Sequence, residues 1–219
     1  MKQFWKDNSL TIVLLLLFAG SILGQWLTGW RVTLEDAARH SQPAQSLADY
    51  TISAQFLSSV FENWESEFLQ MSAYVLFTVF LYQKGSSESK TPGEPESVDR
   101  EPIKSAKDAP WPVRKGGVIL KLYENSLALA FLLLFLGSFM LHAIAGARLH
   151  SKEQELHGKP TISVSEYLAS SRFWFEAFQN WQSEFLAIGS MVFLSIFLRQ
   201  KGSPESKPVD SPHGQTGKN

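Results

Sequence analysis

Two pairs of polar side chains could carry chemistry in a chain whose apolar residues are gathered into blocks. Asn63 and Glu67 are four residues apart, and so are Asn180 and Glu184. Residues at this spacing share one face of an α-helix. If the two helices packed together, two amides and two carboxylates would meet, and such a group could bind a cation or share a proton.

The same residues also have a structural interpretation. Arg31 and Arg148 each follow an apolar block and could pair with the glutamate of the next helix. Glu67 and Glu184 each follow a serine and could cap a helix start, where a negative charge stabilises by about 0.5 kcal/mol. We expect pairing or capping rather than an ion site, because carboxylates in membranes indicate function when they lie deep.

Both polar pairs lie in a segment that occurs twice. The sequence FENWESEFL at 61–69 returns as FQNWQSEFL at 178–186. Trp64 and Trp181 occupy the same position in the two copies. An indole ring is favoured at the boundary between membrane and water, so both tryptophans are predicted to be interfacial anchors.

The repetition extends over most of the chain. The register that pairs Asn8 with Asn125 runs without a gap, and it also pairs Pro43 with Pro160 and Lys84 with Lys201. Roughly two-fifths of the paired positions are identical, which indicates a tandem duplication. Positions paired by this register are called counterparts below.

Four apolar blocks predict four membrane spans, at about 9–28, 64–83, 126–147 and 181–200. A helix needs roughly 20 apolar residues to cross the hydrocarbon core. A basic start before an apolar run is also typical of a cleaved signal peptide. The first block recurs inside the chain, however, so we interpret it as a retained span.

The spans define four regions: repeat 1 (1–85), a cytoplasmic linker (86–117), repeat 2 (118–202) and a tail (203–219). The linker and the tail are rich in Ser, Pro, Glu and Lys, which predicts disorder. The linker is also rich in basic residues, Lys107 among them, and these prefer the cytoplasm. Both termini are therefore predicted to be cytoplasmic, and the two parallel repeats to place their motifs at the outer face.

Several classes of function are disfavoured by the composition. The net charge is −1 and no basic face is interleaved with aromatic residues, so no nucleic-acid partner is expected. The chain has no cysteine, and we find no Ser-His-Asp set, phosphate loop or zinc-protease motif. We therefore predict no enzyme activity, no cofactor and no metal. His142 is interpreted as a hydrogen-bonded contact between helices.

The motif from Glu62 to Met71, together with the ending from Gln83 to Lys90, resembles a bacterial family of small integral membrane proteins. That family is catalogued only as a domain of unknown function. The resemblance covers both repeats and implies a bacterial membrane protein, without an activity or a catalytic residue. The second copy departs from the motif at Gln179 and Gln182, so acidic groups are not needed there in both halves.

We therefore predict an all-α bundle of four spans, made of two parallel helical hairpins, in the inner membrane of a bacterium. The expected function is a non-enzymatic scaffold or envelope component. The alternative is a small ion channel or transporter that uses the Asn and Glu face of the second helix of each repeat. The expected partners are the lipid bilayer and either further copies of the chain or other membrane proteins.

Overall fold

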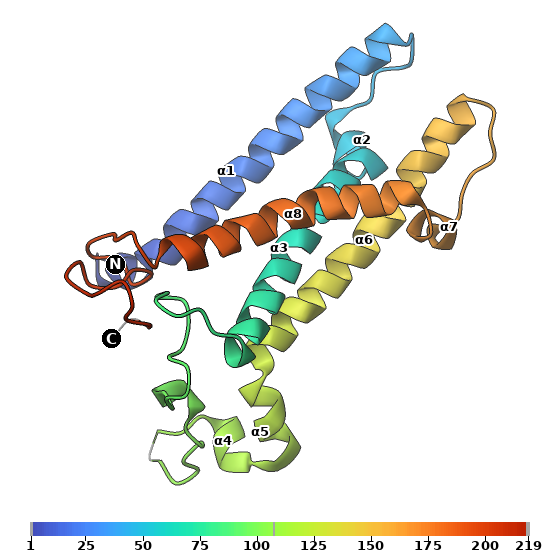
Figure 1. Cartoon of the computed structure of the whole chain (residues 1–219). Helices are drawn as coiled ribbons and strands as arrows, with labels where there is room; N and C mark the ends of the chain where they lie inside the picture. The colour runs from blue at the N-terminus through green and yellow to red at the C-terminus, as the bar shows by residue number, and fades with distance from the viewer. Residues whose placement is uncertain (1, 107, 218–219) are drawn as a thin grey trace.

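The computed structural model describes residues 2–106 and 108–217, so Met1, Lys107, Lys218 and Asn219 lie outside it. Every regular element of the described part is helical, which confirms the all-α prediction. Four long helices dominate the molecule (Figure 1). They are α1 (Lys2–Arg39), α3 (Ala54–Phe80), α6 (Ser126–Leu156) and α8 (Ser171–Leu194).

The remaining helices are short and lie at connections. Helix α2 (Leu47–Thr51) leads into α3, and α7 (Val164–Leu168) leads into α8. Between α3 and α6 the chain forms η1 (Ser97–Asp99), α4 (Trp111–Lys115) and α5 (Gly117–Glu124). Disorder of the linker and of the tail stays a prediction.

Two of the helices are long and apolar enough to cross a membrane. They are α1, over Gln3–Arg39, and α6, over Ser126–Leu156. These helices contain the predicted spans 9–28 and 126–147. Helices α3 and α8 overlap the other two predicted spans without meeting the same test of length and composition.

The bends between the long helices use the same serine caps in both halves. Ser53 accepts a hydrogen bond from the backbone N–H of Phe56, and its counterpart Ser170 accepts one from Phe173. A serine at this position satisfies a backbone donor that the first helical turn leaves free. Ser46 and Ser163 cap α2 and α7 in the same way.

Each bend closes on a contact between a tyrosine and a glycine. Tyr50 lies against Gly29 of α1, and its counterpart Tyr167 lies against Gly146 of α6. Both tyrosines are buried. A Cβ atom at either glycine would overlap the tyrosine side chain. The glycines therefore allow the short helices to pack directly on the long ones.

Aromatic pairs also recur between the long helices of each half. The rings of Phe18 and Trp64 are 6.0 Å apart, and those of their counterparts Phe135 and Trp181 are 6.3 Å apart. These pairs connect α1 with α3 and α6 with α8. The two hairpins thus share several local contacts at counterpart positions.

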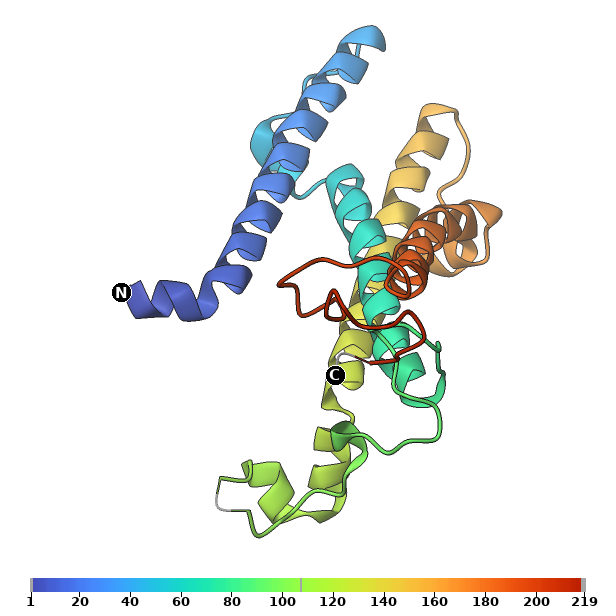
Figure 2. The same ribbon diagram turned by 60° about the vertical axis from the view of Figure 1, so that its left-hand side comes forward.

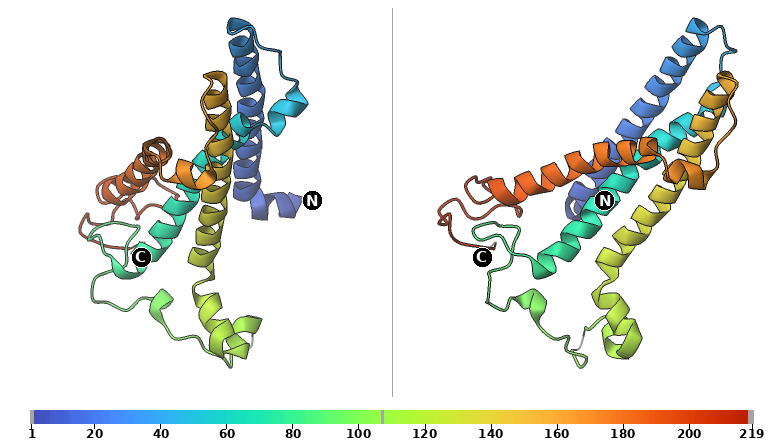
Figure 3. Two further views of the ribbon diagram at one scale, coloured as in Figure 1. Left: turned by 90° about the vertical axis from the view of Figure 1, so that its right-hand side faces the viewer. Right: turned by 45° about the vertical axis from the view of Figure 1, so that its right-hand side comes forward.

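The hairpins meet along α3 and α6, which run side by side (Figures 1 and 2). Helix α8 crosses this pair and contacts α3. Helix α1 lies on the other side of the pair, away from α8 (Figures 2 and 3). Consequently, most of the apolar length of α1 is exposed.

The ends of α3 and α8 are followed by the same turn. In the first copy Ser89 Oγ accepts a hydrogen bond from the N–H of Gln83, and in the second copy Ser206 Oγ accepts one from Gln200. Gly85 and Gly202 have φ angles of 88° and 87°, in the region that favours glycine. The two turns therefore share a backbone conformation and a serine hydrogen bond.

A buried lysine joins the two turns. The Lys207 ammonium lies within hydrogen-bond distance of four backbone carbonyls, and the Lys207 side chain is 2 % exposed. One carbonyl belongs to Gly85, and the others belong to Pro212, His213 and Gln215. We call this arrangement the tail clasp. It fixes the tail against the end of α3.

We predict that Gly146→Ala destabilises the protein. The added methyl group must displace Tyr167, and overpacking of this kind costs about 1–3 kcal/mol. Thermal unfolding in detergent should therefore begin at a lower temperature. Gly137→Ala is the matched control, since nothing lies within 4 Å of a Cβ there. Equal behaviour of the two variants would contradict the packing described for Tyr167.

A second prediction concerns the tail clasp. Lys207→Met keeps the length of the side chain but removes the donors that hold the carbonyls, so the tail should detach. We expect a glutamate-specific protease to cut at Glu205 faster than in the unaltered protein. Lys201→Met removes the same charge from an exposed position and should leave the rate unchanged. Equal rates for the two variants would argue against the clasp.

Candidate functional site

A buried histidine lies between carboxylates from two other helices. His142 of α6 places Nδ1 3.0 Å from Glu65 Oε2 of α3. On the other side of the ring, Nε2 is 3.6 Å from Glu176 Oε2 of α8. The side chains of His142 and Glu65 are fully buried, and that of Glu176 is 22 % exposed. We call these three residues the His142 centre.

Further polar groups hold the carboxylates of this centre. Trp181 Nε1 donates to Glu65 Oε1 at 3.3 Å. The Tyr167 hydroxyl donates a short hydrogen bond to Glu176. Nearby, the Asn180 amide donates to Glu62 Oε1 at 2.6 Å, which adds a third glutamate beside the centre. The side chains come from both hairpins, so the centre forms only when the hairpins pack together.

The centre connects to solvent-exposed side chains through Arg172 of α8. The Arg172 guanidinium donates to Glu176 at 3.1 Å and to Glu153 at 2.9 Å. Arg172 and Glu153 are 44 % and 43 % exposed. A continuous set of polar contacts therefore runs from solvent to the buried imidazole.

These contacts shift the pKa values of Tyr167 and Glu176. Burial, and then the hydrogen bond to Glu176, raise the pKa of Tyr167. Burial alone would also raise the pKa of Glu176, which lies ahead of the predicted span at 181–200. The contact with His142 and the hydrogen bonds from Tyr167 and Arg172 outweigh that effect and lower the pKa of Glu176. The outer carboxylate is thus favoured in its charged form.

Local sequence explains how α6 approaches the other helices so closely. His142 is followed by small buried residues, including Ala143, Ala145 and Gly146. Small side chains let helix backbones come near one another, as is common between membrane helices. Phe173 packs on the imidazole, with ring centroids 5.0 Å apart. The histidine is therefore held in one place by packing as well as by charge.

Polar residues continue along α3 beyond the centre. Gln70 Nε2 donates to the backbone oxygen of Glu184 at 2.9 Å, and Ser72 Oγ donates to that of Ala128 at 3.3 Å. Gln70 and Ser72 are buried. Near the end of the helix, the Tyr74 hydroxyl donates to Glu88 Oε2 at 2.8 Å. We call Gln70, Ser72 and Tyr74 the inner polar line.

The four residues of the predicted ion site do not all take part. Asn180 joins the centre through Glu62. Asn63 donates instead to the backbone of Ser59 in its own helix, and Glu67 is exposed. Glu184 is half-buried and contributes its backbone oxygen to Gln70.

The predicted pairing and anchor residues lie at the borders of this region. Arg31 and Arg148 are exposed, and Arg148 lines an open groove beside α6. Trp64 and Trp181 are half-buried. Trp64 packs on Phe18, whereas Trp181 also bonds to Glu65. The role of these residues as interfacial anchors stays a prediction.

Sequence reasoning did not select Glu62, Glu65 or Glu176 as site residues, and it treated His142 as a contact between helices. A signal was nonetheless present in the differences between the repeats. The counterparts of Glu65 and His142 are Gln182 and Gln25, so a carboxyl group and an imidazole in one place correspond to two amides in the other. Coordinated differences of this kind indicate residues that meet.

Comparison with known proteins gives a family but no function. A family model described as "Domain of unknown function (DUF6766)" matches residues 1–218. The chain belongs to this family. No curated protein and no solved structure matches it. The resemblance to a family of unknown function is thereby confirmed.

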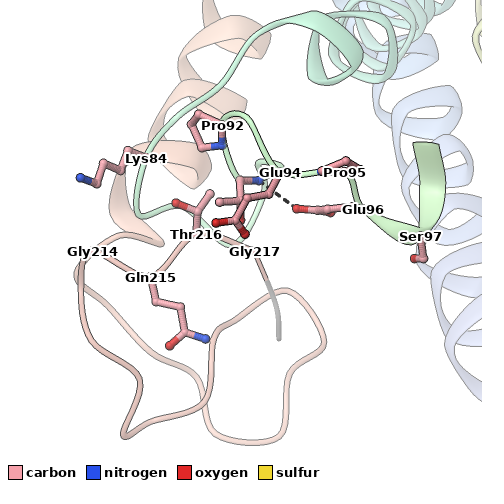
Figure 4. A pocket seen from close by; sticks show the side chains of 11 residues that line it. Lys84, Pro92, Glu94, Pro95, Glu96, Ser97, Gly214, Gln215, Thr216 and Gly217 are labelled. Carbon is pink, nitrogen blue, oxygen red and sulfur yellow. Dashed lines mark hydrogen bonds between the residues drawn. The ribbon is translucent and has the colours of Figure 1, made fainter. Parts of the chain in front are cut away.

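A second cavity in this DUF6766 chain lies between the linker and the tail (Figure 4). It is open and has a volume of about 770 Å³. Its lining includes Lys84, which follows α3, Glu94 and Glu96 of the linker, and Gln215 and Thr216 of the tail. Walls of mixed charge do not favour one class of ligand. Across the described ranges, no group of three or more His, Cys, Asp or Glu could hold a metal ion.

The His142 centre predicts strong coupling between two substitutions. Glu65→Leu or His142→Leu alone leaves a buried polar partner unsatisfied, which costs about 1–3 kcal/mol. Replacing both residues removes both unsatisfied groups, so the double variant should lose less stability than the sum of the single variants. Thermal unfolding of the four proteins in detergent completes the cycle.

Glu67→Leu provides the control for this cycle, because Glu67 is exposed on the same helix. It should change stability by at most about 0.5 kcal/mol, with or without His142→Leu. Additive losses for Glu65 and His142 would show that the two side chains do not interact.

Proposed function

We propose that the protein is a multi-pass protein of the bacterial cell membrane, with four spans at about 9–28, 64–83, 126–147 and 181–200 that lie largely in α1, α3, α6 and α8. The length and apolar character of α1 and α6 support this arrangement. The contacts that recur at counterpart positions support two parallel hairpins derived from a repeat. The Lys and Arg residues of the linker support a cytoplasmic position for both termini.

Within this membrane protein we infer a pathway for protons, which makes the channel or transporter alternative more specific. The observation that carries the inference is the buried imidazole of His142 between Glu65 and Glu176. Ionisable side chains inside membranes are rare, and relays of Asp, Glu and His are typical of proton pathways. His142 lies in a helix apolar enough to cross a membrane. An ionisable side chain in such a helix is costly, and its presence there indicates a function.

The chemistry of the centre suits proton transfer. An imidazole can receive a proton on Nε2 while it releases another from Nδ1. In this centre the Glu65 carboxylate would accept the proton from Nδ1, and a proton that arrives from solvent beside the Glu176 carboxylate would be passed on to Nε2. Return of the ring to its first tautomer, by rotation or by a second transfer, readies it for the next proton.

Both sides of the centre have groups that could extend the pathway. On the outer side, Glu176 contacts Arg172, which reaches exposed Glu153. On the inner side, the inner polar line extends along α3 to Tyr74 on two faces of the helix. Ser72 shares the face of Glu65 and contacts α6, whereas Gln70 contacts α8 and Tyr74 contacts Glu88. At 1.5 Å per residue the stretch from Glu65 to Tyr74 covers about 14 Å, nearly half of a hydrocarbon core of roughly 30 Å. Waters between these groups would complete the relay.

A scaffold is the second candidate, favoured by a different observation. The apolar side chains of α1 are widely exposed, with Leu10 at 72 % and Leu16 at 65 %. Such a helix offers a long surface to helices of other membrane proteins. In that case the His142 centre would only hold the two hairpins together. Neither candidate involves an enzymatic reaction, a cofactor or a metal.

The two candidates differ in proton flux. The test uses purified protein in liposomes that contain a pH-sensitive dye, with a potassium gradient and valinomycin to drive protons inward. We expect flux from the unaltered protein and the rate of protein-free liposomes from the variant Glu65→Gln, His142→Gln, Glu176→Ser. Each substitution introduces the residue found at the counterpart position, so the other repeat already folds with that residue in place.

Glu67→Gln with Glu184→Gln is the control for a general loss of carboxylates, and it should retain the flux. Unfolding temperatures measured in parallel report whether each variant is folded. If folded, unaltered protein gives no flux above protein-free liposomes, the proton pathway is wrong and the scaffold candidate takes its place.

A further inference from the structure

The contact between α3 and α6 joins the second helix of one hairpin to the first helix of the other. Three pairs of residues illustrate it. Glu65 bonds to His142, the rings of Phe68 and Phe131 are 6.5 Å apart, and Ser72 bonds to the backbone of Ala128. This is the most extensive contact between any two helices of the described chain.

The register of the repeat assigns a counterpart to this contact. The second helix of the other hairpin is α8, and the first helix is α1. The counterpart pairs are Gln182 with Gln25, Phe185 with Leu14, and Gly189 with Thr11. The side chains of Phe185 and Leu14 are 39 % and 56 % exposed, and Gln182 is exposed as well. The counterpart surfaces are thus free in the single chain.

The two surfaces are chemically matched. Glu65 and His142 pair a carboxyl group with an imidazole, whereas Gln182 and Gln25 are two amides, each of which can donate to and accept from the other. A charge opposite an amide would be poorly compensated in an apolar environment. The residues at both positions differ between the copies, and the pair remains complementary in each.

Gln25 also makes a contact within its own hairpin that corresponds to the contact between His142 and Glu176. His142 faces Glu176 of its own hairpin, and Gln25 donates to the counterpart residue, Ser59, at 3.1 Å. An amide has two donor hydrogens and two acceptor positions, so this bond leaves capacity for a second partner. Gln25 is therefore equipped for a contact across hairpins like that of His142.

Within one chain, α3 separates α1 from α8. Trp64 of α3 packs on Phe18 of α1, while Gln70 of α3 bonds to Glu184 of α8. Figures 2 and 3 show α1 and α8 on opposite sides of the pair formed by α3 and α6. A second copy of the chain can supply each surface without displacing α3.

We propose that the protein forms a two-fold symmetric homodimer in the membrane, in which α1 of each copy packs on α8 of the other. Gln25 of one copy faces Gln182 of its partner, and Leu14 faces Phe185. The two-fold axis makes this contact twice and closes the assembly. The dimer does not depend on proton conduction, since it follows from the packing of the hairpins.

Cysteine cross-linking tests the proposal directly, because the chain contains no cysteine. Gln25→Cys in one copy and Gln182→Cys in a copy with a different affinity tag are co-expressed, and the membranes are oxidised. We expect a disulfide-linked species that carries both tags. Leu23→Cys replaces Gln25→Cys in the control, because it points about 200° away around the helix. The control should give no such species.

A second pair, Leu14→Cys with Phe185→Cys, guards against a local disturbance at the glutamines and should also cross-link between copies. Both pairs are repeated with the two cysteines in one chain. A disulfide within a single chain, with none between copies, would mean that α1 closes on its own α8 and would overturn the dimer. Absence of any cross-link from both pairs would overturn it as well.

Discussion

The bond between His142 and Glu65 is the constraint on which the rest of the structure depends. Removing two polar groups from water costs several kcal/mol for each ion unless they are paired. His142 belongs to one hairpin and Glu65 to the other, so neither is satisfied until α3 and α6 are in register. The small residues that follow His142 allow the necessary approach, and Trp181 orients the carboxylate. The bond therefore selects one arrangement of the two hairpins and also stabilises it.

Much of the helical architecture could be predicted from apolar blocks, because each block is long enough to form a helix, and those in α1 and α6 are also long and apolar enough to cross a membrane. The ends of the helices could not be predicted in this way. Helix α1 continues to Arg39, well beyond the apolar block at 9–28. Its last turns keep the helical backbone hydrogen bonds although their side chains, Glu35 and Arg39 among them, are exposed. Apolar composition marks where lipid is expected, whereas a helix ends only where its backbone pattern is interrupted.

The site was predicted less well for a physical reason. Helical spacing finds side chains that share a face of one helix, and so it selected Asn180 together with Glu184. Glu65 and His142 lie on different helices and 77 positions apart in the chain, where no spacing rule applies. Their meeting depends on how the hairpins pack. The two copies nonetheless contained information about it, since both residues change to glutamine at their counterparts.

The order of synthesis gives the separation of Glu65 from His142 a further consequence. A ribosome that adds roughly 5–20 residues per second needs about 4–15 seconds to make the 77 positions between them. During that interval the first hairpin has no imidazole for its glutamate. A buried carboxyl group without a hydrogen-bond partner is costly. The packing of Glu65 against α6 can therefore be completed only after the second hairpin has been synthesised, so the first hairpin must wait for the second before it reaches its final packing.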